Sequence, residues 1–310
     1  MGVVLVHIDG EPADPWIAEF ARQAPEIDAR ALSGIADPAT VEVAVTWNLP
    51  WGLYGTFPRL RLIQSMAAGV DHVLSDPGRP ADVPIARLVD PWMARAMSHH
   101  VILQILRWHR RLDLFEADRG EQRWRYGVTF HPDTVRVGVL GLGHLGQSVA
   151  RALQGLGFTT AGWSRSPKTL EGLETFHGAE GLAELAARST VLVCLLPLTA
   201  ETEGILNAKV FAHMPEGSFL VNVGRGGHLV EDDLFTALDQ GHLSAAALDV
   251  MAVEPLPSKH RAWSDTRIYL TPHIASEINP TTATTVFIEN IRRLRRGETP
   301  TGLIDPARGY

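Results

Sequence analysis

The chain has 310 residues, which is enough for two modest domains, each with its own hydrophobic core. Hydrophobic residues make up 45% and charged residues 20%, an ordinary globular composition that excludes a disordered chain. The formal net charge is −7, and the one dense basic run, Arg292 to Arg296, is expected to close a helix, so we expect no nucleic-acid partner.

Membrane insertion and cysteine chemistry are not expected either. No segment is long and apolar enough to span a membrane, and the N-terminal residues lack the basic leader of a signal peptide, so we expect a soluble, cytoplasmic protein. Cys194 is the only cysteine, which excludes an intrachain disulfide and the Cys-rich zinc sites, and we expect no metal site. Because Cys194 lies in the apolar run STVLVCLLPL, we expect a buried strand residue rather than a nucleophile.

In the first part of the chain, short apolar runs alternate with helical segments that contain proline. Four runs are expected to be strands of a parallel sheet that is buried on both faces: residues 3–8, 41–47, 60–66 and 84–89. Residues 92–119 then carry apolar side chains at spacings of three and four. This spacing predicts one long helix, which Pro91 is well placed to open.

A second series of strand and helix units follows. Six apolar runs are expected to be strands: residues 135–140, 158–163, 191–196, 218–223, 245–250 and 268–272. The segments between them, such as 144–156 and 231–241, have helical spacing, and a last helix is expected at about 281–296. Repeated units of this kind predict a second doubly wound parallel sheet.

The segment VGVLGLGHLG places Gly141, Gly143 and Gly146 between a predicted strand and a predicted helix. The first glycine permits a tight turn, the second lets the backbone approach a pyrophosphate, and the third lets the helix pack on the strand. The helix N-terminus then favours the phosphate charge. Because a further strand follows, the pattern predicts dinucleotide binding, with His144 and Leu145 counted in the cofactor site.

The segment AGWSRSPKTL lies about twenty residues beyond this turn, where a carboxylate normally binds the ribose 2′-OH of NAD. The chain offers Ser164, Arg165, Ser166 and Lys168 instead. An arginine fork and hydroxyl groups can bind a 2′-phosphate, so the segment predicts NADP(H) as the preferred cofactor, with NAD(H) still possible. The alternative is a solvated basic turn with no ligand.

Arg225 in LVNVGRGGHLVEDDL, Glu254 in AALDVMAVEPLP and His273 in LTPHIAS each follow a predicted strand. The carboxyl ends of parallel strands are where such sheets bind ligands. Any one of these residues could be a surface charge or a histidine satisfied by its neighbours. The three together indicate a catalytic site.

These three segments resemble the D-isomer-specific 2-hydroxyacid dehydrogenases, and the resemblance runs along essentially the whole chain, including SMAAGVDHV at residues 65–73. Within the family, further stretches are similar to the subgroup of glyoxylate/hydroxypyruvate reductases A: VTWNLP, WSRSPK, LPLTAETEGILN, VEDDLFTALDQG and DPARGY. The resemblance implies two doubly wound α/β domains with the active site between them. A flavodoxin-like substrate domain would comprise residues 1–97 and 277–310, and a Rossmann cofactor domain residues 98–276.

The resemblance also implies the reduction of small 2-keto acids, such as glyoxylate and hydroxypyruvate, to 2-hydroxy acids. Arg225 would bind the substrate carboxylate and carbonyl through its planar fork. His273 would donate the proton to the carbonyl oxygen as the hydride arrives. Glu254 would orient the imidazole and favour its protonated form.

The remaining site residues also come from the resemblance. Trp47 would line the substrate pocket or, alternatively, cap the domain core, and the backbone N–H groups of Ala68 and Gly69 would approach the substrate carboxylate. Trp124 would reach toward the partner in a homodimer. Asp249 would hold the nicotinamide carboxamide. The cofactor site would further include Leu196, Pro197, Thr202, Val223, Gly224, His273 and Ala275.

Two alternatives stay open at this point. A dehydrogenase-like binding protein that senses NAD(P)H could lose Glu254 or His273, so their presence beside Arg225 favours an enzyme. A dehydrogenase for another small anion, such as formate or phosphite, would have a similar arginine and cofactor site. The Glu–His pair favours carbonyl protonation, because formate oxidation donates no proton to the substrate.

Overall fold

The computed structural model describes residues 2–126, 131–307 and 309. The chain divides into two compact units, Met1–Met93 with Ile278–Tyr310, and Ala94–Glu277. We call them the five-stranded unit and the seven-stranded unit. The domain boundaries expected from the sequence, at residues 97 and 277, lie near these divisions, and the expected class of two parallel-sheet α/β domains is confirmed.

The five-stranded unit contains a parallel sheet of order β2-β1-β3-β4-β5. This is the strand order of flavodoxin-like folds. The strands are β1 (Val3–Ile8), β2 (Ala29–Ala31), β3 (Val41–Trp47), β4 (Leu62–Ser65) and β5 (Ile85–Ala86). Strand β2 was not predicted, because its three residues, ARA, carry no apolar run.

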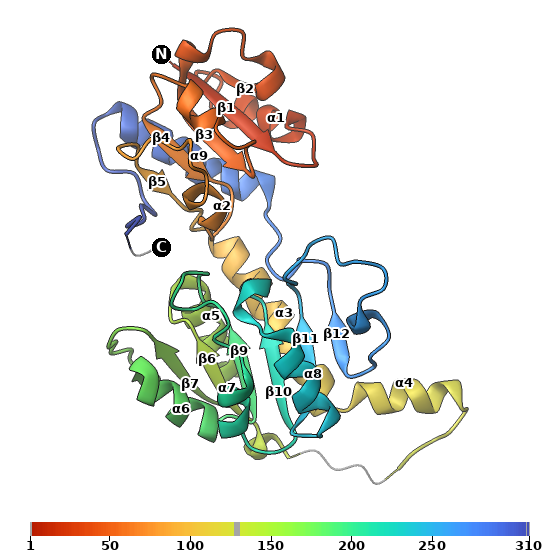
Figure 1. The fold of residues 1–310 in the computed structure, drawn as a ribbon. Helices are drawn as coiled ribbons and strands as arrows, with labels where there is room; N and C mark the ends of the chain where they lie inside the picture. Colours follow the sequence, from red (N-terminus) through yellow and green to blue (C-terminus); the bar gives the residue numbers. More distant parts are fainter. Residues whose placement is uncertain (1, 127–130, 308, 310) are drawn as a thin grey trace. The chain divides into compact units, whose positions relative to one another are not determined.

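Helices cover one face of this sheet and loops cover most of the other. Helices α1 (Asp14–Gln23) and α9 (Pro280–Arg295) pack on one face, where Phe20 and Phe287 are fully buried (Figure 1). The short helix α2 (Asp71–Leu74) and the segment around Tyr54 contribute to the core on the opposite face. Helix α9 begins with a capping residue, since the side chain of Asn279 accepts hydrogen bonds from two backbone N–H groups.

A buried polar network ties the C-terminal segment to this sheet. Asn290 on α9 donates through Nδ2 to Gln64 Oε1 on β4 at 2.8 Å, and its Oδ1 accepts from the Thr301 N–H at 2.8 Å. Both amide side chains are nearly inaccessible, so their hydrogen bonds offset the cost of burial. Two residues of the DPARGY motif, Arg308 and Tyr310, lie outside the described residues.

The seven-stranded unit contains a parallel sheet of order β12-β11-β10-β9-β6-β7-β8. With β6 as its first strand, this is the Rossmann order 3-2-1-4-5-6 with one further strand. The strands are β6 (Arg136–Leu140), β7 (Thr159–Ser164), β8 (Glu174–His177), β9 (Val191–Cys194), β10 (Ser218–Asn222), β11 (Leu243–Leu248) and β12 (Ile268–Leu270). Short 3₁₀ helices in the chain lie at Leu32–Gly34, Pro38–Thr40, Leu53–Thr56, Pro132–Thr134, Gly226–His228 and Arg261–Trp263.

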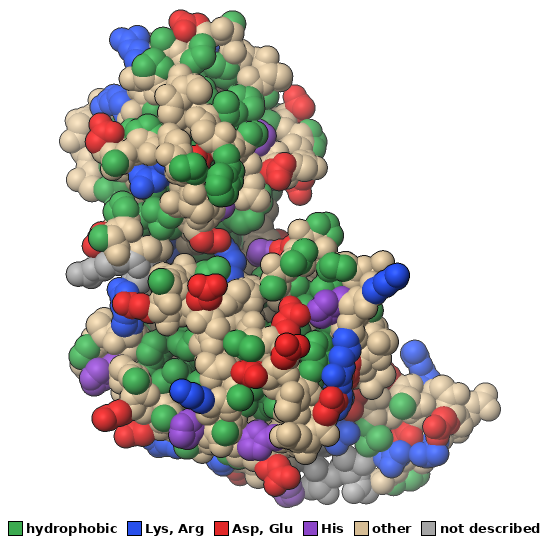
Figure 2. Space-filling view, in the orientation of Figure 1, with side chains coloured by type: hydrophobic (Ala, Val, Ile, Leu, Met, Phe, Trp, Pro, Cys, Tyr) green, Lys and Arg blue, Asp and Glu red, His purple; other side chains and the backbone are tan. Residues whose placement is uncertain are grey.

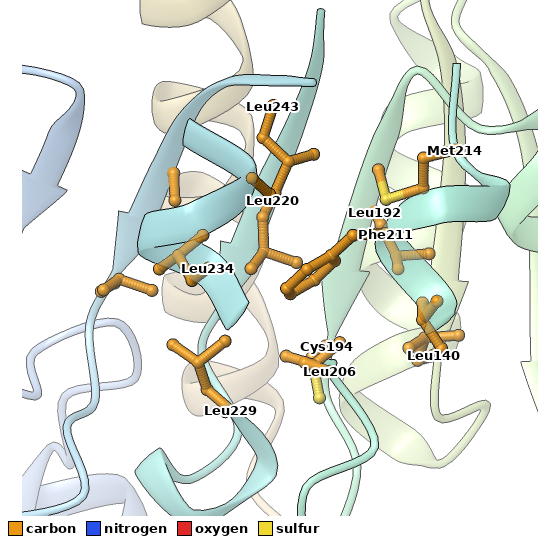
Figure 3. Packing of buried hydrophobic residues seen from close by; sticks show 14 of the residues in the cluster. Leu140, Leu192, Cys194, Leu206, Phe211, Met214, Leu220, Leu229, Leu234 and Leu243 are labelled. Atoms are coloured by element: carbon orange, nitrogen blue, oxygen red, sulfur yellow. The ribbon is translucent and has the colours of Figure 1, made fainter. Parts of the chain in front are cut away.

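Alternate residues of these strands point into two separate hydrophobic cores. Leu192 and Cys194 pack with the helices α6 (Gly178–Arg188), α7 (Ala208–His213) and α8 (Glu231–Asp239), as Figure 3 shows for Phe211 and its neighbours. The opposite face packs against α3 (Pro91–His109) and against α5 (His144–Gly155). Cys194 is fully buried, as predicted, and burial raises the pKa of its thiol to about 12, which makes it a poor nucleophile.

The prediction of one long helix over residues 92–119 is wrong. The segment forms α3 (Pro91–His109) and α4 (Leu112–Gly120), separated at Arg111, which adopts a left-handed conformation with φ of 51°. Trp108 fixes the end of α3, because its ring stacks on Phe219 and its Nε1 donates to Ser244 Oγ at 2.9 Å. Helix α4 then leaves the sheet (Figure 1).

Acidic and basic side chains lie side by side on the face of the seven-stranded unit drawn in Figure 2. Ion pairs in this unit include Arg267 with Asp265 and Arg261 with Asp239. Within the described ranges, no helix is long and apolar enough to cross a membrane.

Candidate active site

The glycine-rich turn connects β6 to α5. Gly141 has φ of +100°, and a Cβ there would meet the Leu195 carbonyl oxygen at 2.7 Å. A Cβ on Gly146 would meet the Gly141 oxygen at 1.7 Å, so both positions require glycine. Nothing lies within 4 Å of the corresponding point at Gly143, which leaves room for a ligand to approach the backbone.

The start of α5 suits a pyrophosphate. Gly143 caps the helix without a side-chain hydrogen bond, and His144 and Leu145 form its first turn. The first N–H groups of a helix have no partner within it and carry partial positive charge. The turn therefore fits the dinucleotide that the sequence predicts.

The predicted ribose segment follows β7 at the same edge of the sheet. Ser164 is nearly buried and donates through Oγ to the Ser166 carbonyl at 2.8 Å. Lys168 Nζ donates to the Leu142 carbonyl at 2.8 Å, which links this segment to the glycine-rich turn. The structure thus places the two segments of the predicted cofactor site in contact.

Arg165 has a carboxylate partner. Its Nη1 lies 2.6 Å from Glu201 Oε2, and both side chains are solvent-accessible, with relative exposures of 39% and 64%. Glu201 was not identified from the sequence as a site residue, because it is 36 positions away and becomes a neighbour only when the strands align.

The loop after β9 carries three further predicted cofactor residues, Leu196, Pro197 and Thr202. The Thr202 hydroxyl donates to the Pro197 carbonyl at 2.7 Å and accepts from the Thr199 N–H at 2.9 Å. These bonds fix the shape of the loop. Two more predicted residues, Val223 and Gly224, follow β10 directly.

Arg225 is held by its own loop. Asn222 Nδ2 donates to the Arg225 carbonyl at 3.1 Å, and the Arg225 N–H donates to His228 Nδ1 at 2.9 Å. His228 is fully buried. A Cβ on Gly226 would meet the Met251 carbonyl carbon at 2.0 Å, which explains the glycine beside the arginine.

Glu254 and His273 form a hydrogen bond. Glu254 Oε2 lies 2.8 Å from His273 Nδ1, and Oε1 accepts from the Met251 N–H at 2.9 Å. Since a carboxylate only accepts, Nδ1 carries the proton in this bond. Burial raises the pKa of Glu254, but the bonds from His273 and Met251 and the charge of Arg225 together hold it below its usual value. Glu254 is therefore ionised at neutral pH.

The loop that carries His273 is anchored by Asp249, which is buried at the end of β11. Its Oδ1 accepts from the Thr271 hydroxyl at 2.7 Å and from the Ile274 N–H at 2.9 Å, and its Oδ2 accepts from the Ala275 N–H at 2.8 Å. His273 itself has φ of 57°, an uncommon value outside glycine. Such a conformation persists because the surrounding hydrogen bonds fix it, and it is common at functional sites.

The predicted substrate residues Trp47, Ala68 and Gly69 lie in the five-stranded unit. Trp47 ends β3, and its ring contacts that of His72 with centroids 4.5 Å apart. Ser65 Oγ lies 3.0 Å from the Gly69 carbonyl and accepts from the Ala67 N–H at 3.1 Å, so this serine shapes the small-residue loop. The sequence did not single out Ser65 or His72 as functional residues.

The chain has one flavodoxin-like sheet and one Rossmann sheet, and the Rossmann sheet carries a glycine-rich turn and the residues Arg225, Glu254 and His273. Together these features define an oxidoreductase of the dehydrogenase class. The chain belongs to the D-isomer specific 2-hydroxyacid dehydrogenases, whose NAD-binding domain matches residues 102–275. It is 40% identical to glyoxylate/hydroxypyruvate reductase A from Serratia proteamaculans over 303 residues, which cover 96% of each chain.

Solved structures show the same similarity. A D-isomer specific 2-hydroxyacid dehydrogenase from Xanthobacter autotrophicus Py2, crystallised with NADPH and MES, is 40% identical with a TM-score of 0.95, over 100% of this chain and 99% of the other. An NADPH-dependent glyoxylate/hydroxypyruvate reductase from Sinorhizobium meliloti, in complex with NADP and sulfate, is 35% identical with a TM-score of 0.94 over 100% of both chains.

Proposed function

We propose that this protein catalyses the NADPH-dependent reduction of small 2-keto acids, such as glyoxylate and hydroxypyruvate, to 2-hydroxy acids. The family membership supports the reaction class, and the relatives described above support the substrates and the cofactor. The observation that carries the proposal is the 2.8 Å bond between Glu254 and His273, beside an arginine whose charge reaches the same carboxylate.

In the proposed mechanism the chain binds the keto acid and delivers one proton. Arg225 binds the carboxylate and polarises the carbonyl through its planar fork. Because His273 Nδ1 faces Glu254, Nε2 is the nitrogen that donates the proton to the carbonyl oxygen. Bound NADPH would supply the hydride to the carbonyl carbon. Before the proton is transferred, Glu254 stabilises the imidazolium of His273 and sets the direction in which the ring points.

The five-stranded unit carries the other predicted substrate residues. Backbone N–H groups of Ala68 and Gly69 would bind the substrate carboxylate, and Trp47 would limit the space beside the keto carbon.

The cofactor would lie along the seven-stranded sheet. The pyrophosphate would bind at the start of α5, and the 2′-phosphate would contact Ser164, Arg165, Ser166 and Lys168. The other predicted contacts are at Leu196, Pro197, Thr202, Val223, Gly224, Asp249 and Ala275. NADP(H) would be preferred, with NAD(H) as a poorer cofactor. The bonds that Asp249 makes to the His273 loop leave its Oδ2 with room for one more donor, such as the carboxamide.

We infer that two copies associate through the segment around α4. Helix α4 stands away from the sheet, and Trp124 and Tyr126 beyond it are 82% and 84% exposed, which is unusual for large aromatic side chains (Figure 1). Trp124 would then lie near the partner's active site. Sedimentation of the parent and of Trp124→Ser with Tyr126→Ser would test this, and a parent that sediments as a monomer would contradict it. The cytoplasmic location remains a prediction.

The test of the proposed reaction is an absorbance assay of the reduced nicotinamide with NADPH and NADH against a panel of 2-keto acids. We expect NADPH oxidation with glyoxylate and hydroxypyruvate. A second set of assays, with NADP⁺ and either formate or phosphite, tests whether the protein oxidises one of these anions instead. Oxidation of formate or phosphite together with no reduction of any keto acid would contradict the proposal.

A further inference from the structure

The proposed 2′-phosphate site already contains a carboxylate. Glu201 Oε2 lies 2.6 Å from Arg165 Nη1, the guanidinium that we expect to bind the phosphate. Both side chains belong to the seven-stranded unit and come from loops after β7 and β9, at the carboxyl ends of the strands. The pair therefore lies at the edge of the sheet where the cofactor would bind.

An ordered turn presents Glu201 to Arg165. The Thr202 and Glu203 N–H groups both donate to the Thr199 carbonyl, at 3.0 and 2.9 Å, and the Thr202 side chain is nearly buried. The backbone of Glu201 is thus fixed between anchored residues, while its side chain remains 64% exposed. Because the backbone is already fixed, pairing with the arginine costs only the conformational freedom of the Glu201 side chain.

A carboxylate and a 2′-phosphate compete for the same guanidinium. The carboxylate is planar and the phosphate is tetrahedral, but the oxygens of both accept hydrogen bonds from the guanidinium N–H groups. The phosphate carries a charge of about −1.5 to −2 at neutral pH. If Glu201 kept its place after the phosphate had bound, two anions would lie beside one guanidinium and repel each other. The ribose 2′-OH of NADH carries no charge, so it neither competes with Glu201 for the guanidinium nor is repelled by the carboxylate.

We propose that Glu201 is an intramolecular competitor for the 2′-phosphate at Arg165, and that it lowers the preference of this protein for NADP(H) over NAD(H). The inference rests on the proposed function, because it assumes that the loop after β7 binds the phosphate. Glu201 is thereby a specificity-determining residue. The opposite arrangement, in which Glu201 braces Arg165 toward the phosphate, predicts the opposite sign for its removal.

The experiment is an equilibrium titration that follows the fluorescence of bound NADPH and NADH, so it needs no turnover. Glu201→Gln keeps the size of the side chain and removes its charge. We expect Kd for NADPH to fall about two- to fivefold, the range that an exposed ion pair supports, while Kd for NADH stays unchanged. Glu203→Gln is the matched control, since it removes the same charge from the same exposed turn.

A double variant separates competition from a general charge effect. In an Arg165→Ala background, Glu201→Gln should leave Kd for NADPH unchanged, because the contested guanidinium is gone. Thermal unfolding of each variant confirms that it is folded.

Three results would overturn the inference. Weaker NADPH binding by Glu201→Gln would identify a brace rather than a competitor. Equal effects of Glu201→Gln and Glu203→Gln, or no effect of either, would mean that the ion pair does not oppose the phosphate. A parent that binds neither dinucleotide would instead remove the proposed cofactor itself, and this outcome is distinct from the other two.

Discussion

Two groups of loops leave the same edge of the seven-stranded sheet and are built differently. The loops with Arg225, Glu254 and His273 are fixed by buried side chains, and Asp249 alone accepts three hydrogen bonds from the His273 loop. The loops with Arg165 and Glu201 instead carry exposed side chains joined by an ion pair. The difference suits their tasks: proton transfer needs fixed geometry, whereas cofactor exchange needs contacts that can be made and broken.

The largest effect on the reaction should come from a change in the fixed loops that carry Arg225, Glu254 and His273. His273→Ala removes the proton donor, and we expect the reduction rate to fall by about two to four orders of magnitude while NADPH binding is retained. Steady-state kinetics with glyoxylate and a fluorescence titration of NADPH measure the two quantities. His213→Ala, on the exposed end of α7, is a control that should leave both unchanged. Near-normal turnover of His273→Ala would remove this residue from the mechanism.

The exposed group should act on cofactor choice alone. If the parent prefers NADPH, Arg165→Ala with Lys168→Ala should abolish most of a preference on the order of a hundredfold, because two charge-assisted contacts are lost. The change should appear in KM for NADPH, with kcat nearly constant, since the ribose is remote from the hydride. Arg188→Ala with Lys209→Ala removes two exposed cations elsewhere as a control. A parent that binds both dinucleotides equally would show that the basic segment is a solvated turn.

Arg225→Lys tests whether the geometry of the fixed group matters beyond its charge. Lysine keeps the charge but loses the bidentate fork, so we expect KM for the keto acid to rise about 10- to 100-fold with little change in NADPH affinity. Arg188→Lys is the matched control on the surface. An unchanged KM would place substrate binding elsewhere, for example only at the loop of Ala68 and Gly69.

The smallest of these effects concerns pH. The lowered pKa of Glu254 means that its carboxylate is charged throughout the neutral range, and this charge lies 2.8 Å from His273 Nδ1. Glu254→Gln removes this counter-charge, so the pH above which the reduction rate declines should move down by about one unit. A pH profile of kcat/KM measures the shift. If the profile stays in place, the hydrogen bond between these residues does not govern protonation.

The predictable parts of the molecule are those with a local signal. Buried strands such as β9 show as apolar runs, and Gly141 and Gly146 mark a turn that admits no side chain. The break between α3 and α4 has no such signal, because Arg111 adopts its left-handed conformation without a glycine or proline beside it. The ion pair of Glu201 with Arg165 and the hydrogen bonds by which Asp249 anchors the His273 loop could not be predicted either, since these contacts depend on strands meeting across the sheet.

The order in which the chain is synthesised has a consequence for the five-stranded unit. Its sheet is encoded before residue 87, but α9, which covers Phe20 and the neighbouring core, is encoded after residue 279. The seven-stranded unit is continuous in sequence and can complete its core on the ribosome as it emerges. The first unit must wait with an apolar face uncovered until α9 has been synthesised, and this interval is when the nascent protein is most exposed to aggregation and most dependent on chaperones.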